Sequence, residues 1–83
     1  MTVYLVNTFE NKGWGMYHNN HDVLIAQAVF KNKYRAMKYI KDHGYGLYKG
    51  RNSKDERGNS VTEYRAKTQG TYLYFTLTHI EVE

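Results

Sequence analysis

The lysine and arginine side chains in the middle of the sequence are the groups best suited to binding chemistry. From Lys31 to Lys67 there are eleven lysines and arginines against four acidic residues, a net charge of +7, whereas the rest of the chain carries −3. Ammonium and guanidinium groups pair with phosphates and carboxylates. This distribution predicts an anionic partner, although a basic face that contacts only water would account for it equally well.

A helix predicted over Lys33 to His43 would position several of these cations. Asn32 is suited to cap its start, and Gly44 is suited to end it. Three cations crowd the first turn, where the helix dipole favours carboxylates and each cation costs about a few tenths of a kcal/mol. Stability alone does not favour this arrangement, so we expect a partner to compensate for it.

The segment from Lys49 to Ser60 contains no apolar residue, so it has no side chain that would gain from burial. Uninterrupted polar stretches of this length are often functional or disordered loops. We therefore predict a long mobile loop over residues 49–60 that carries four more cations. The predicted partner-binding residues of the helix and this loop are Tyr34, Arg35, Lys38, Lys41, Lys49, Arg51, Lys54 and Arg57.

Aromatic residues make up 16% of the sequence, including nine tyrosines, which is more flat apolar surface than one helix can cover. Trp14 lies between two glycines and is a candidate anchor for a partner, with a loop packed on the core edge as the alternative. Tyr72 and Tyr74 alternate with apolar residues in a strand pattern. Their face is suited to water, to stacked bases or to a second copy of the chain, so a homodimer is one expectation.

The sequence lacks the residue combinations of an enzyme. There is no nucleophile with a placed base, no carboxylate pair in apolar surroundings and no cofactor motif. His18 and His21 could face one ion, but with no cysteine and only Asp22 nearby they are better explained by an ordinary turn. We predict no catalytic residue, no metal and no cofactor.

The remaining pattern predicts strands around the helix. Residues 2–9 form a central strand, residues 22–30 a strand buried on both faces, and residues 61–67 a short strand near an edge. A turn at residues 69–70 leads into a last strand over 71–83, with a bulge near Thr78 and His79. The expected core comprises Leu5 or Val6, Ile25, Val29, Phe30, Ala36, Ile40, Phe75 and Leu77.

These elements define the predicted fold class. We expect one α+β domain over residues 1–83, with a single antiparallel sheet of four to five strands and one helix packed on one face. The 83 residues include no cysteine, no signal-peptide pattern and no apolar run long enough to span a membrane. A cytoplasmic protein with no membrane partner is therefore expected.

The chain resembles a family of small uncharacterised single-domain α+β proteins of bacteria and phages. The resemblance rests on residues 3–6, on residues 22–26 with Val29 and Phe30, on Ala36 and Ile40, and on the terminal strand ending in Glu-Val-Glu. It implies a strand-strand-helix-strand order and no known catalytic residue. The family pattern has acidic residues in the first helical turn, where this chain has cations, and its polar insertion is shorter.

Two functions follow as expectations. The first is a small non-enzymatic binding protein, encoded by a phage or mobile element, that engages and modulates a host protein or nucleoprotein complex as an inhibitor or counter-defence protein. The second is a basic nucleic-acid-binding module that uses its lysines, arginines and exposed tyrosines.

Overall fold

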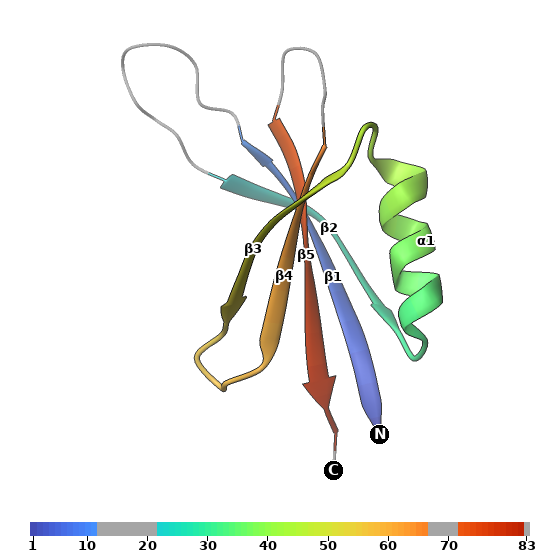
Figure 1. The fold of residues 1–83 in the computed structure, drawn as a ribbon, viewed down its shortest axis with the longest axis vertical. Coiled ribbons are helices and arrows are strands. Elements are labelled where there is room, and N and C mark those ends of the chain that lie inside the picture. The colour runs from blue at the N-terminus through green and yellow to red at the C-terminus, as the bar shows by residue number, and fades with distance from the viewer. Residues whose placement is uncertain (12–21, 67–71, 83) are drawn as a thin grey trace.

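A computed structural model describes residues 1–11, 22–66 and 72–82 of the chain. They form one antiparallel five-stranded sheet and one helix, which confirms the predicted α+β class (Figure 1). The elements are β1 (Thr2–Asn11), β2 (Asp22–Phe30), α1 (Lys33–His43), β3 (Tyr48–Lys54), β4 (Ser60–Ala66) and β5 (Tyr72–Glu81).

The strand order in the sheet is β2-β1-β5-β4-β3, and every neighbouring pair is antiparallel. The two edge strands, β2 and β3, therefore run parallel to each other. The chain joins them through α1, which lies beside β1 and β2, and through a link that crosses in front of the sheet to β3 (Figure 1). This crossover places the basic helix and the basic edge strand β3 in one continuous stretch of chain.

The predicted bounds of α1 are confirmed, and local hydrogen bonds explain them. The side chain of Asn32 accepts a hydrogen bond from the backbone N–H of Tyr34 at 2.7 Å, which caps the start. Gly44 ends the helix, and its N–H donates to the carbonyl of Ile40 at 3.0 Å. A Cβ on Gly44 would lie 2.8 Å from the side chains of Leu47 and Phe75, so this position has no room for a larger residue.

The core lies between α1 and one face of the sheet. Ala36 and Ile40, one helical turn apart, are fully buried against Val6 and Phe75. Leu77 and Ala66 complete the buried cluster. Val6, Ala36, Ile40, Phe75 and Leu77 were expected here, and Phe30 packs at the margin of the cluster.

The prediction that residues 22–30 are buried on both faces is wrong. Because α1 covers the sheet face that carries Val6, Val29, which pairs with Leu5 on the other face, is 62% exposed. Ile25 is 50% exposed. The register with β1 shifts between Thr8 and Phe9, so that Ile25 has no partner residue across the ladder. Apolar content alone indicates a strand but does not show how many of its faces are covered.

The predicted long loop over residues 49–60 is also wrong. Residues 48–54 form β3, and the irregular part is a turn from Asp55 to Asn59 before β4 begins at Ser60. An edge strand needs only backbone hydrogen bonds to its neighbour, so it tolerates a fully polar sequence. The turn is held by hydrogen bonds within itself, and Gly58 adopts a φ of 82° that favours glycine.

Two smaller predictions concern the C-terminal strands. The strand predicted near an edge is β4, and this is confirmed, since β4 lies next to the edge strand β3. The predicted bulge at Thr78 and His79 is not present, since β5 keeps an unbroken register with β1 from Tyr72 to Glu81. The predicted turn at residues 69–70 lies outside the described residues.

Candidate anion-binding surface

Residues 31–54, from the end of β2 to the end of β3, carry most of the positive charge and are called the basic crossover. They contain eight lysines and arginines against one acid, Asp42, and all eight cations are exposed. None of the eight has a carboxylate within ion-pair distance in the described parts of the chain. The ion pair found there joins Arg65 Nε and Glu63 Oε1 at 2.7 Å, on β4. The cations of the basic crossover are therefore free to bind an external anion.

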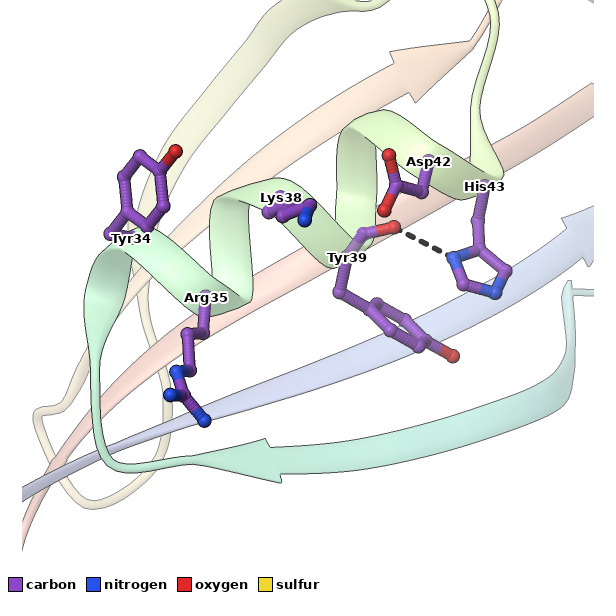
Figure 2. Close-up of a pocket in the computed structure, with 6 residues that line it drawn as sticks. All are labelled: Tyr34, Arg35, Lys38, Tyr39, Asp42 and His43. Atoms are coloured by element: carbon purple, nitrogen blue, oxygen red, sulfur yellow. Dashed lines mark hydrogen bonds between the residues drawn. The ribbon is translucent and has the colours of Figure 1, made fainter.

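One side of α1 forms a wide, shallow groove of about 470 Å³ that Figure 2 shows in close-up. The Tyr39 ring packs between Phe30 and His43, with ring centroids 5.4 Å and 4.1 Å away. Arg35, Tyr39 and His43 lie on the side of the helix toward β2, whereas Tyr34 points away from them. The lining residues are Tyr34, Arg35, Lys38, Tyr39, Asp42 and His43.

His43 has a fixed proton position in this groove. Its Nδ1 lies 2.7 Å from the carbonyl oxygen of Tyr39, and because a carbonyl only accepts, Nδ1 must carry the hydrogen (Figure 2). The ring therefore presents Nε2 as the atom available to a partner. An open groove of this kind is suited to an extended macromolecular surface, since small-molecule sites enclose most of their ligand.

A second hollow, of about 110 Å³, is smaller and more enclosed, and is called the donor pocket. It lies on the helix side of the sheet, between the first residue of α1 and the strands that the helix leaves uncovered. Seven of its eight lining residues carry hydrogen-bond donors, and no carboxylate lines it. The lining comprises Tyr4, Lys33, Lys49, Ser60, Thr62, Tyr64, Leu77 and His79.

The sheet register explains how residues distant in sequence meet in the donor pocket. Tyr4 on β1 pairs with His79 on β5, and Lys49 on β3 pairs with Tyr64 on β4. Paired residues point to the same face of a sheet, which here is the face that also carries buried Leu77. The pocket therefore combines four strands with the first residue of the helix.

The residues predicted to bind a partner do not form one surface. Tyr34, Arg35 and Lys38 line the groove, Lys49 lines the donor pocket, and Lys41, Arg51, Lys54 and Arg57 are exposed on α1, β3 and the following turn. Tyr74 lies on the opposite face of the sheet, stacked on Phe9 with ring centroids 5.1 Å apart and with the Arg65 guanidinium 5.9 Å from its ring. The side chain of Tyr72 and the whole of Trp14 lie outside the described residues.

Sequence reasoning missed most of the donor pocket. It named His79 only in a predicted bulge and Lys33 only as the first residue of the predicted helix, and it assigned no binding role to Tyr4, Thr62 or Tyr64. The alternation of residues within each strand was visible in the sequence. The pairing of strands was not, because it depends on β5 inserting between β1 and β4.

Other kinds of site find little support within residues 1–11, 22–66 and 72–82. No three histidine, cysteine or carboxylate side chains gather there as metal ligands would. No helix in the same ranges is long and apolar enough to cross a membrane. His18 and His21, the pair considered for a metal, fall outside the described ranges.

Comparison with known proteins gives no further guide to function. No family model matches the chain, and neither the curated proteins nor the solved structures contain a significant match. The resemblance to small bacterial and phage proteins therefore stays a prediction.

Proposed function

We propose that this chain is a non-enzymatic binding protein that engages nucleic acid within a nucleoprotein complex through the basic crossover. The observation that carries the proposal is the set of eight unpaired, exposed cations in residues 31–54. The same stretch exposes three tyrosines, with 75% of Tyr34, 83% of Tyr45 and 50% of Tyr48 accessible. Cations that track phosphates and rings that stack on bases are the two elements of sequence-tolerant nucleic-acid binding.

The start of α1 supports an anionic partner for a second reason. With no acidic residue in the first turn, Lys33 and Arg35 repel the positive end of the helix dipole. A phosphate bound near this end would pair with the cations and also interact favourably with the dipole. The partner would then offset a cost that the free protein bears.

A protein partner is the second candidate, and the exposed apolar edge strand β2 favours it. Leu24, Ile25 and Val29 are each about half exposed or more, and no charged residue interrupts residues 23–30. An unpaired edge of this kind accepts a strand from another chain. Modulation of a host protein, as an inhibitor would achieve it, would use this edge.

Binding of a labelled single-stranded oligonucleotide, followed by anisotropy from about 50 to 200 mM salt, tests the proposal. The variant Arg35→Gln/Lys38→Gln is compared with Leu24→Glu/Val29→Glu, which changes the net charge equally at exposed positions of β2. We expect the first variant to reduce the slope of log affinity against log salt by about 1.4, from about 0.7 per lost phosphate contact. The second should keep the slope.

Equal losses in both variants would show that only net charge matters and would contradict an interface on the basic crossover. No binding of the wild-type protein to single- or double-stranded nucleic acid would refute the proposal. Suppose that a protein captured from cells by the wild type is also captured by Arg35→Gln/Lys38→Gln but not by Leu24→Glu/Val29→Glu. The protein-binding candidate would then replace the nucleic-acid-binding proposal.

A further inference from the structure

The donor pocket has a composition that points to one chemical group. Resting on the proposed function, we propose that it binds the terminal phosphate monoester of a nucleic-acid strand. The pocket is separate from the open groove on α1, and the two share no lining residue. In this proposal the pocket holds the end of a strand, while the groove and the remaining cations contact its internal phosphates.

The donors of the pocket have no protein acceptors. In the described chain, Lys33, Lys49, Thr62 and the hydroxyls of Tyr4 and Tyr64 make no hydrogen bond or ion pair. Lys33 and Lys49 are exposed and the hydroxyl residues are partly exposed, so water satisfies these donors in the free protein, and an acceptor-rich ligand would replace that water. A phosphate presents only acceptors.

The acids closest to the pocket are directed elsewhere. Glu81, two residues beyond His79, accepts a hydrogen bond from the Thr2 hydroxyl. Glu63, on β4 between Thr62 and Tyr64, points to the other face of the sheet and pairs with Arg65. The two lysines are therefore not neutralised inside the pocket, and a dianionic ligand would match their charge.

The volume of the pocket selects the kind of phosphate. The pocket has a volume of about 110 Å³ and is more enclosed than the groove on α1, so it is suited to a small oxyanion. A terminal monoester can enter end-on with three free oxygens. An internal diester has two free oxygens and a chain that continues on both sides, so it fits such a hollow poorly.

The first test uses inorganic phosphate alone and the intact protein. In an NMR titration at constant ionic strength, we expect saturable shifts of the amides of Lys33, Lys49, Thr62, Tyr64 and His79. The variant Lys33→Gln/Lys49→Gln should abolish them, whereas the matched variant Lys38→Gln/Lys41→Gln should keep them. Tyr64→Phe removes one hydroxyl and keeps the aromatic ring with its packing contacts. It should therefore lower the affinity for phosphate severalfold and leave the protein folded.

The second test compares oligonucleotides of one sequence that end in phosphate or hydroxyl, at the 5′ or the 3′ end. We expect a preference of about tenfold for one phosphorylated end, the size of one charge-assisted interaction. Lys33→Gln/Lys49→Gln should lose this preference, and its affinity for the hydroxyl form should fall no further than that of the charge-matched variant Lys38→Gln/Lys41→Gln. Lys38→Gln/Lys41→Gln should lose affinity for both forms and keep the preference.

The outcomes separate the two proposals. Oligonucleotide binding without end preference and without phosphate shifts would overturn the pocket and leave the proposed function standing. Amide shifts on addition of inorganic phosphate, with no binding of any oligonucleotide, would overturn the proposed function. They would also overturn the assignment of the donor pocket to the end of a nucleic-acid strand. A phosphopeptide that competes better than the phosphorylated oligonucleotide would overturn that assignment as well.

Discussion

Tyr4 and His79 lie opposite each other on β1 and β5, with ring centroids 4.6 Å apart, and both line the donor pocket. The contact orients two rings that come from opposite ends of the sequence. Since the Tyr4 ring also packs against the core cluster, its hydroxyl is held on a well-supported side chain. The pocket is thus built partly from residues that also stabilise the fold.

Tyr4→Phe is expected to separate these two roles. It removes the hydroxyl and keeps the ring contacts, so the thermal melting temperature should stay close to that of the wild type while phosphate affinity falls severalfold. Calorimetry and the phosphate titration provide the two measurements. Unchanged phosphate affinity would mean that this hydroxyl does not contact the ligand.

Ile40→Ala is expected to lower the free energy of unfolding by about 2–5 kcal/mol, because Ile40 is fully buried between α1 and the sheet. Chemical denaturation gives the value. Tyr34→Ala, on the exposed side of the same helix, should change it by less than about 0.5 kcal/mol. If Ile40→Ala lowered the free energy of unfolding by less than about 0.5 kcal/mol, the conclusion that the Ile40 side of α1 faces the core would be wrong.

Asp55 is expected to make the turn between β3 and β4 sensitive to acid. Hydrogen bonds from the Asn59 side chain and backbone, and from the Arg57 N–H, hold the pKa of Asp55 below its ordinary value of 3.8. A lowered pKa means that ionised Asp55 stabilises the fold above pH 3.8, and that this contribution is lost as pH falls through the lower, folded-state value. Melting temperature measured against pH should fall less steeply over this window in Asp55→Asn than in the wild type.

The exposed edge strand β2 is expected to promote self-association. Val29→Lys places a charge on an apolar edge at a 62% exposed position, so it should reduce association while leaving monomer stability within about 0.5 kcal/mol. Sedimentation over a range of concentrations checks this. If the wild type stays a 9.8 kDa monomer at high concentration, both this prediction and the homodimer expected from Tyr72 and Tyr74 are refuted.

The sequence predicted the fold class, the helix and its buried face, because these depend on local periodicity and on caps such as Asn32. It placed Ile25 and Val29 in the core, because apolar content does not reveal which side chains of β2 lie on the face that α1 covers. It took residues 49–60 for a loop, because a polar edge strand has no apolar alternation to detect. The donor pocket depends on which strands pair, and that information is not local.

The position of β5 has a consequence for how the chain folds. Its middle place in the sheet pairs it with β1 across 79 residues of sequence, as the contact between Thr2 and Glu81 shows. Before β5 docks, the β1–β2 and β3–β4 pairs share no neighbouring strand, and Phe75 and Leu77 are missing from the core. Such distant pairing slows folding, since a large loop must close before any contact compensates for it. A chain emerging from a ribosome would therefore present two separate hairpins, with Phe75 and Leu77 still missing from the buried face of α1, until β5 emerged.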